Sequence, residues 1–438
     1  MPRKVMIWPV LALLVTACGP GTTPRPPATP APATSTPATS APPVSPDAPP
    51  TSRDAPPTTP GAPSTAPDAR RADDIDGDGR SDLVVQVDLP REDRRYLSIV
   101  HGSPQGLDPR RRTLITSETF DPWLIDDGIR ADLDGDGFGD VLAYGRPGGG
   151  EHRMGPHIFW GGPRGIAATA TPTPVPLPVA SDVGNYRAVA GDFDGDGAAD
   201  VAMSSPPAQG ASDTNLAVLY GPFARDGAPR RRSVQPSPTG SEFWRMSVDR
   251  IGAGHATALL VYEGDDGEQT SGWLLAPGRG GPAKQGRKLN KGMSAAFGDF
   301  DGDGSRDVAV GDDGSRNDEP GYESEAPSVD RTLTVYYGGG RTGTFKGTAG
   351  RAVSGDFDGD GRDDLAFGGG SRPILTFWGT AGGLRAGGRL AAAAGSRPLA
   401  AGDYDGDGDD ELALASGADD FQIIVTDGRK TLTTLPSR

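Results

Sequence analysis

The chain has 438 residues, a formal net charge of −16 at pH 7, 66 glycines, 43 prolines and one cysteine. A single cysteine excludes an intramolecular disulfide framework, and the acidic balance argues against a nucleic-acid partner, which selects a basic surface. Beyond the first residues, no segment is long and apolar enough to span a bilayer.

Residues 1–17 have the pattern of a secretion signal. Arg3 and Lys4 make a basic start, a short apolar run follows, and small residues precede Cys18. The tetrapeptide Val-Thr-Ala-Cys that ends at Cys18 resembles the bacterial lipobox, in which the cysteine is lipidated and becomes the mature N-terminus. An ordinary signal peptide is the alternative. The lipobox predicts a secreted protein, lipid-anchored to the outer side of the bacterial cell membrane, with no other membrane contact.

Residues 18–68 are rich in Pro, Thr, Ala and Ser and have almost no large apolar side chains. Such a segment cannot bury enough apolar surface to offset its ordering entropy, so we predict a disordered linker. Its prolines favour extended conformations of about 3.1 Å per residue. This linker suits a spacer between a membrane and a folded domain.

The remaining residues, 69–438, repeat one short aspartate-rich motif. Six copies follow the pattern D-x-D-G-D-G-x-x-[DE] and begin at Asp74, Asp132, Asp192, Asp299, Asp356 and Asp403. A degenerate copy, DRIGAGHAT, begins at Asp249 and keeps the first aspartate and both glycines. The starts of the seven copies are 47 to 60 residues apart, so the chain contains seven units of one repeat.

Each unit predicts about four short strands separated by Gly- and Pro-rich turns. In the third unit the four runs are YRAVAGD, VAM, LAVLYG and RRRSVQPSP. Four strands per unit at this period are typical of propeller blades. We therefore expect an all-β fold, a seven-bladed β-propeller of four-stranded antiparallel blades over residues 69–438. The arginines 110–112 and 230–232 are interpreted as protection of outer edge strands; a nucleic-acid patch is the alternative.

The motif places oxygen ligands at a spacing that suits calcium. Carboxylates fall at positions 1, 3, 5 and 9, position 7 offers its carbonyl, and the glycines at positions 4 and 6 permit a positive φ. A loop rich in protein oxygens fits calcium better than magnesium. The sequence therefore predicts six calcium ions, with these ligands: Asp74, Asp76, Asp78, Arg80, Asp82, Asp132, Asp134, Asp136, Phe138, Asp140, Asp192, Asp194, Asp196, Ala198, Asp200, Asp299, Asp301, Asp303, Ser305, Asp307, Asp356, Asp358, Asp360, Arg362, Asp364, Asp403, Asp405, Asp407, Asp409 and Glu411.

Two alternative interpretations of the motif are weaker. Hydrated turns without metal are one, but four carboxylates within a few ångströms repel one another strongly, and a hairpin needs only Asp-Gly. A phosphotransferase motif is the other, but it should occur once, and no G-K-[ST] phosphate loop accompanies it. Loss of Arg3 and Lys4 with the leader changes the net charge from −16 to −18, and six Ca²⁺ ions would bring it to −6.

These loops resemble FG-GAP (VCBS-type) repeats, which form the N-terminal propeller of integrin α chains and occur in many bacterial surface proteins. The resemblance covers residues 69–438 and rests on the six loops. The Phe-Gly and Gly-Ala-Pro signatures of the family are only weakly preserved. It implies loops that join the first and second strands of a blade and hold Ca²⁺ on one face. In the degenerate loop Ile251, Ala253 and Thr257 replace three acids. We therefore expect no ion in blade 4 and a turn role for His255.

The face opposite the Asp loops is the predicted binding surface. Strand alternation places the loops between second and third strands there, and the longest insertions fall in these loops in blades 2 to 5. Long loops on a rigid scaffold often carry binding residues, and the resemblance implies partner recognition by this face. We expect a monomer that binds an extracellular protein or glycan, with these candidate residues: His152, Arg153, His157, Trp244, Tyr322 and Glu323.

Two other function classes stay open at this point. One is a hydrolase or lyase that acts on an extracellular polymer at the propeller axis. The chain has four histidines and no nucleophile-elbow motif, and EHRMGPH lacks the spacing of a helical zinc motif. The other is a purely structural role at the envelope, for which the long loops would be variable, solvated segments. We expect binding without catalysis.

Overall fold

The computed structural model describes residues 72–89, 94–116, 120–123, 129–147, 155–177, 188–205, 214–243, 245–251, 255–264, 268–317, 319–321, 323–417 and 422–436. The predicted signal peptide 1–17, Cys18 and the linker 18–68 lie outside these residues, as do the candidates His152, Arg153, Trp244 and Tyr322. Within the described ranges, no helix has the length and apolar character needed to cross a bilayer.

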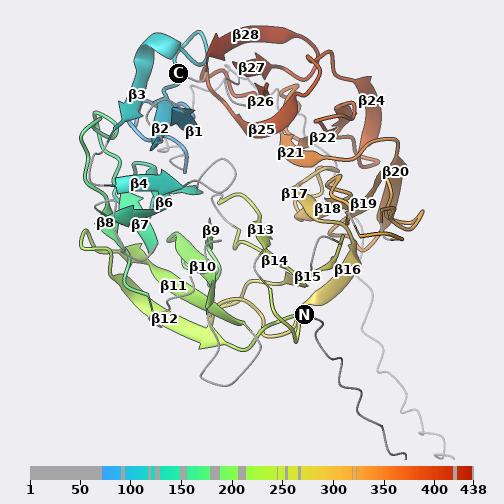
Figure 1. Cartoon of the computed structure of the whole chain (residues 1–438), viewed down its shortest axis with the longest axis horizontal. Helices are drawn as coiled ribbons and strands as arrows, with labels where there is room; N and C mark the ends of the chain where they lie inside the picture. Colours follow the sequence, from blue (N-terminus) through green and yellow to red (C-terminus); the bar gives the residue numbers. More distant parts are fainter. Residues whose placement is uncertain are drawn as a thin grey trace, which may run out of the picture. The chain divides into compact units, whose positions relative to one another are not determined.

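Seven antiparallel sheets follow one another around a ring and are numbered here as blades 1 to 7 (Figure 1). Blade 1 contains β1 (Leu83–Leu89), β2 (Arg94–Val100), the short 3-10 helix η1 (Pro109–Arg111) and β3 (Arg112–Ile115). Blade 2 contains β4 (Phe120–Trp123), β5 (Ile129–Ala131), β6 (Asp140–Pro147), β7 (Gly155–Phe159) and β8 (Thr173–Pro174). Blades 3 to 7 each contain four strands, which are β9 (Ala188–Gly191), β10 (Asp200–Ser205), β11 (Asn215–Phe223) and β12 (Pro229–Gln235); β13 (Met246–Val248), β14 (Leu259–Tyr262), β15 (Ser271–Leu275) and β16 (Arg287–Lys291); β17 (Ser294–Gly298), β18 (Asp307–Gly311), β19 (Thr332–Tyr336) and β20 (Thr342–Lys346); β21 (Arg351–Gly355), β22 (Asp364–Gly368), β23 (Leu375–Trp378) and β24 (Arg385–Arg389); and β25 (Arg397–Gly402), β26 (Glu411–Ser416), β27 (Gln422–Thr426) and β28 (Thr431–Pro436).

This arrangement confirms the predicted seven-bladed β-propeller. In blades 3 to 7 the four strands are hydrogen-bonded in chain order, from the innermost to the outermost. Blade 1 has three strands among the described residues, because the segment that precedes its Asp loop lies before residue 72. The inner strand of blade 2 is in two pieces, β4 and β5, which pair with opposite halves of β6.

Burial decreases from the second strand of a blade to the outermost one. Strands β10 and β18 are buried at every residue, because both of their edges are paired and both of their faces are covered. The outer strand β12 alternates between partly buried and exposed residues, as a strand with one solvated face does. The arginines 230–232 lie on this outer strand, as expected, whereas Arg110 and Arg111 fall in η1, just before β3.

The hydrophobic core lies between neighbouring blades. Apolar residues of β1 and β2 pack with apolar residues of β25, β26, β27 and β28, which joins blade 1 to blade 7. The amide of Ser81 in blade 1 donates to the carbonyl of Asp403 in blade 7 (2.9 Å), and the amide of Gly139 in blade 2 donates to the carbonyl of Asp74 in blade 1 (2.7 Å). The ring therefore closes through the same contact that joins other neighbouring blades.

Candidate metal centres and the axial cavity

In blades 2 to 7 the Asp loop, or its degenerate copy in blade 4, joins the first and second strands, as the resemblance implies. In blade 3 the loop 192–200 links β9 to β10, and its glycines Gly195 (φ 74°) and Gly197 (φ 85°) adopt the positive φ that other residues disfavour. The loop curls round Asp192, whose Oδ1 accepts the amides of Gly195 (2.7 Å) and Asp196 (3.1 Å) and whose Oδ2 accepts that of Gly197 (3.0 Å). The corresponding glycines of the other five intact loops also have positive φ.

In five of the six intact loops the ninth residue anchors the loop to a glycine in or just after the next strand but one of the blade. Asp200 is 0% exposed; its Oδ2 accepts the amide of Phe193 (3.0 Å) and its Oδ1 that of Gly221 (2.9 Å). The same pair of bonds is formed by Asp82, Asp140, Asp307 and Asp364. Each carboxylate oxygen has further lone-pair capacity, so the ninth residue is both an anchor and an available metal ligand.

Carboxylate oxygens converge within the loops. In blade 3, one oxygen from each of Asp192, Asp194 and Asp200 lies within 4.8 Å of the others, and all three residues are buried. Asp194 Oδ1 is buried and has no hydrogen-bond partner. In other loops the residues at positions 1, 3 and 5 form such groups, namely Asp74, Asp76 and Asp78; Asp132, Asp134 and Asp136; and Asp299, Asp301 and Asp303. Converging carboxylates repel one another, and a bound cation would relieve that repulsion. This all-oxygen set fits calcium.

Burial raises the pKa of three ninth-position aspartates far above the ordinary range. The pKa of Asp140, Asp200 and Asp364 is about 7, mainly because burial penalises the charged form, and neighbouring aspartates of the same loop add to the increase. The amides bound to these oxygens act in the opposite direction. The same balance raises the pKa of Glu411 to about 8. At neutral pH the ionised form is therefore costly, and a bound cation would relieve that cost.

Comparison with known families agrees with this architecture. A family model described as an FG-GAP-like repeat matches residues 132–203 and 356–414, which include the Asp loops of blades 2, 3, 6 and 7. The chain is an FG-GAP repeat β-propeller. An FG-GAP β-propeller generally fits a binding or adhesion-type protein. A search of curated proteins found no match.

Arginines cover the outer side of several loops of the FG-GAP propeller. In four blades an arginine pairs with the carboxylate at position 3, in Arg225–Asp134 (2.5 Å), Arg231–Asp194 (2.6 Å), Arg341–Asp301 (2.7 Å) and Arg429–Asp358 (2.8 Å). The four guanidinium groups also lie over aromatic rings, 3.4 to 4.9 Å from the ring centroids, of Trp160, Tyr220, Tyr337 and Trp378. Basic residues of the outer strands and turns therefore balance the charge of the loops, a role that the sequence analysis missed.

In the degenerate loop of blade 4, an arginine side chain of the next blade provides the positive charge beside the remaining aspartate. Arg306 of blade 5 donates to the two oxygens of Asp249 through Nε (2.8 Å) and Nη2 (2.7 Å), and through Nη1 to Asp363 (3.0 Å). Asp249 is 2% exposed, and a bidentate guanidinium is well suited to such a buried carboxylate. Thr257, at the ninth position, accepts the amide of Asp192 instead (2.8 Å). The one acid that the described part of this loop retains is thus already neutralised.

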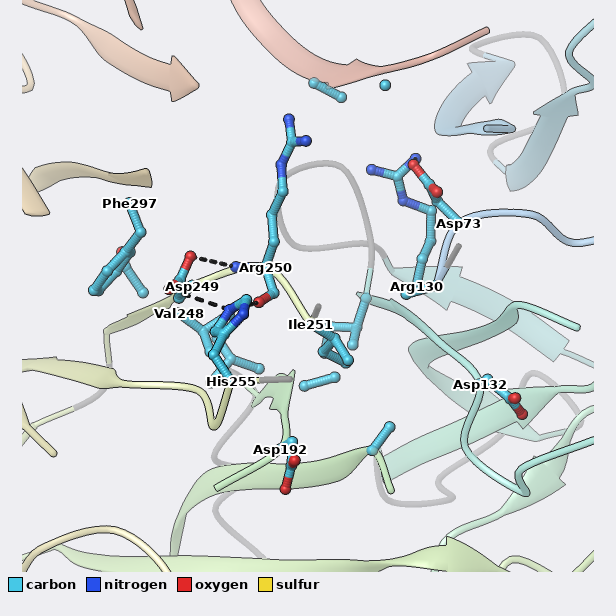
Figure 2. A pocket seen from close by; sticks show the side chains of 18 of the residues that line it. Asp73, Arg130, Asp132, Asp192, Val248, Asp249, Arg250, Ile251, His255 and Phe297 are labelled. Atoms are coloured by element: carbon cyan, nitrogen blue, oxygen red, sulfur yellow. Dashed lines mark hydrogen bonds and ion pairs between the residues drawn. The ribbon is translucent and has the colours of Figure 1, made fainter. Parts of the chain in front are cut away.

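A cavity of about 1540 Å³ runs along the inner strands, and Arg250 extends across it (Figure 2). Its guanidinium donates to Asp410 Oδ2 (2.7 Å) and to the carbonyl of Ser354 (2.6 Å), which belong to blades 7 and 6. His255 also lines the cavity, with Nε2 3.8 Å from Asp249 Oδ2. Because Arg306 binds both oxygens of this aspartate, the contact does not resemble the histidine–aspartate pair of a hydrolase, in which the carboxylate orients the imidazole.

The structure describes two of the candidate partner-binding residues. One of them, His157, is buried, whereas the other, Glu323, is exposed. His157 lies on β7 and is 5% exposed; its ring packs on Phe120 (4.7 Å between centroids) and its Nδ1–H donates to the Gly155 carbonyl (2.9 Å). Burial lowers the pKa of this histidine. It is a core side chain and not part of an exposed loop, because β7 already begins at Gly155. Glu323 is exposed, and its Oε2 accepts the amide of Gly321 (3.0 Å).

The sequence analysis also assigned no role to the residue at the second position of the Asp loop. The residues at this position are 0 to 2% exposed in the six intact copies, in Ile75, Leu133, Phe193, Phe300, Phe357 and Tyr404. Each lies in the hydrophobic cluster shared with the next blade. The sequence could have indicated this packing role, because the second position is apolar in the six intact copies and is Arg250 in the degenerate one. His101 was missed as well; it precedes Gly102, where four other blades have Trp or Tyr.

Proposed function

We propose that this FG-GAP propeller is a calcium-stabilised extracellular binding protein without catalytic activity, anchored to the outer side of the bacterial cell membrane by lipidated Cys18. The observation that supports the proposal is the repeated convergence of carboxylates within the loops, which in Asp192, Asp194 and Asp200 are all buried. Sites of this kind in extracellular modules have dissociation constants of about 10⁻⁴–10⁻³ M, which match the calcium available outside cells.

Calcium would be held by the carboxylates at positions 1, 3, 5 and 9 of the six intact loops and by the carbonyl at position 7. The ion would supply the counter-charge for buried carboxylates. The chain orients the ligands in advance, because backbone amides fix Asp192 and Asp200. The arginines leave room for the ion: Asp194 binds Arg231 through Oδ2, while its buried Oδ1 has no hydrogen-bond partner.

The insertion of blade 5 supports partner recognition on the opposite face. It joins β18 to β19, so it leaves the blade at the end opposite the Asp loop. Arg316 binds both oxygens of Asp312 (2.9 and 2.7 Å) and one of Asp330 (2.7 Å), which ties the start of the insertion to its end. Such preorganisation lowers the entropic cost of binding. Glu323 lies between these tied ends and is exposed, as a recognition residue would be.

The partner is sought with a glycan array and with a pull-down from cell-surface extracts. The wild type is compared with a variant in which residues 318–328 are replaced by a short Gly-rich turn, and with Arg429→Ala, whose 61% exposed side chain is on the Asp-loop side. We expect the first variant to lose the partner and the second to retain it. Equal binding by both would contradict recognition by the insertion. Cleavage of a bound glycan would contradict the absence of catalysis, and no binding by the wild type would favour a structural envelope role.

The anchor is tested separately by Cys18→Ser. We expect the wild type, but not the variant, to incorporate a labelled fatty acid, because a serine hydroxyl cannot form the thioether that carries the lipid. Equal labelling of both, or no labelling of the wild type, would contradict lipidation of Cys18.

A further inference from the structure

The Asp loop of blade 1 differs from its counterparts because a buried histidine points at it. His101 follows β2 and is 7% exposed. Its Nδ1 lies 3.2 Å from Asp82 Oδ2 and 3.5 Å from Asp76 Oδ2, and this buried nitrogen has no hydrogen-bond partner. Ligand atoms of the three residues all lie within 4.8 Å of one another.

The surroundings hold the histidine and the carboxylate in place. Nε2 of His101 is 3.4 Å from Thr113 Oγ1. In the tautomer with its proton on Nε2, the lone pair of Nδ1 faces the two carboxylates, and either a bound cation or a proton on Nδ1 would relieve the repulsion. Asp82 accepts the amides of Ile75 (3.0 Å) and Gly102 (2.9 Å), so its orientation is fixed. Hydrogen bonds of this kind around metal ligands orient them and raise affinity.

The equivalent position in other blades has no nitrogen ligand. His101 precedes the glycine whose amide binds the ninth carboxylate, and the residues at the same place are Trp160, Tyr220, Tyr337 and Trp378. There the arginine that lies over the ring pairs closely with the position-3 carboxylate, at 2.5 to 2.8 Å. In blade 1 the arginine is Arg111, and it lies 3.4 Å from Asp76 and 3.3 Å from Asp78. Loop 1 thus combines a looser arginine contact with an added imidazole.

We propose that Asp76, Asp82 and His101 form a binding site for a divalent transition-metal ion, with zinc as the best-fitting member of that class. Calcium and magnesium take oxygen ligands, whereas imidazole nitrogen together with carboxylate oxygen suits zinc and its neighbours. In loop 1 this ion would take the place of the calcium proposed above for six loops, so this loop differs in metal selectivity from the five all-oxygen loops. The site does not depend on whether those loops bind calcium.

The test is a titration of the purified, untagged full chain with ZnCl₂ by isothermal calorimetry, in millimolar CaCl₂ to saturate the oxygen-only loops. His101→Phe places a ring like those of the other blades, and His101→Gln keeps a polar side chain in case the first variant folds poorly. His255→Gln is the matched control, because this histidine lies near Asp249 in the degenerate loop. We expect one zinc site in the wild type and in His255→Gln, and a loss of zinc affinity of about 100-fold or more in both His101 variants.

A second readout identifies the ligand directly. Co²⁺ in place of zinc should give a paramagnetically shifted imidazole N–H signal in the proton NMR spectrum, and this signal should be absent from the His101 variants. Unchanged zinc affinity in His101→Gln would overturn the proposal. Absence of zinc binding by the wild type would overturn it too, and would mean that a protonated His101 is itself the counter-charge of the loop.

Discussion

Removal of divalent ions should make the stability of the propeller fall as pH rises. In the ion-free protein the pKa of Asp140, Asp200 and Asp364 is about 7 instead of 3.8, mainly because of burial. Between about pH 4 and pH 7 the folded protein therefore holds protons that the unfolded chain has released. The stability that these protons supply is complete below about pH 4 and is lost as pH rises through 7.

The expected change is large enough to measure by calorimetry. For one carboxylate, the loss between about pH 5 and a folded-state pKa of about 7 is about 3 kcal/mol. With an unfolding entropy of about 2.1 cal/mol/K per residue over residues 69–438, this corresponds to about 4 °C in melting temperature. The three carboxylates together should lower the melting temperature of the ion-free protein by roughly 10 °C between about pH 5 and pH 8.

The assay is differential scanning calorimetry of resin-stripped protein at both pH values, with and without millimolar CaCl₂. Calcium should raise the melting temperature by more than about 10 °C at pH 8 and by less at pH 5, because protons compete for the same carboxylates. His157→Gln is the control, because the lowered pKa of this histidine acts in the opposite direction and costs stability as pH falls below about 6.5. A stripped protein that melts no lower at pH 8 in both backgrounds would refute the reasoning, as would the absence of any calcium effect.

Three further predictions concern contacts between blades, each measured by urea unfolding. Phe300→Ala should cost about 3–5 kcal/mol because a ring that is 0% exposed is removed, whereas Arg250→Ala, at the same loop position of blade 4, should cost less than about 1 kcal/mol because its side chain is 42% exposed. Gly161→Ala should cost about 1–3 kcal/mol, since a Cβ there would lie 2.2 Å from a backbone oxygen, and Gly162→Ala, with open space around it, should be neutral within about 0.5 kcal/mol. Arg306→Gln should cost about 3–5 kcal/mol by leaving a buried carboxylate unpaired. Equal effects within either pair, or a neutral Arg306→Gln, would contradict the described contacts.

The fold and the outline of the loops could be predicted because both are local properties of a repeat. Seven copies give seven blades, and positive φ at positions such as Gly195 and Gly197 follows from the motif itself. The placement of His157 could not be predicted in the same way. It depends on where an insertion ends and a strand begins, and β7 starts two residues before the histidine. Residues 156–159 of this strand are all buried, so the ring of His157 lies in the core.

The arginine partners of the loops could not be predicted, because the paired residues are far apart in the sequence, some within one blade and some in different blades. Arg231 and Asp194 are 37 positions apart, and Arg250 and Asp410 are 160 positions apart. A basic run on an outer strand fits edge protection equally well when only its own blade is considered. The distinction requires the position of each guanidinium relative to the loop beside it.

Charge balance explains how one loop of seven could lose its acids without loss of the blade. In an intact loop the proposed calcium ion would neutralise the converging carboxylates, whereas in blade 4 the remaining Asp249 is bound by Arg306. Arg306 occupies the eighth position of the blade 5 loop, and no other intact loop has an arginine there. The arginine in the blade 5 loop therefore supplies the charge that the single acid of the blade 4 loop faces. Either of two substitutions alone should be destabilising: Ile251→Asp would add an uncompensated carboxylate beside a pair that is already neutral, and loss of Arg306 would leave Asp249 buried without a partner.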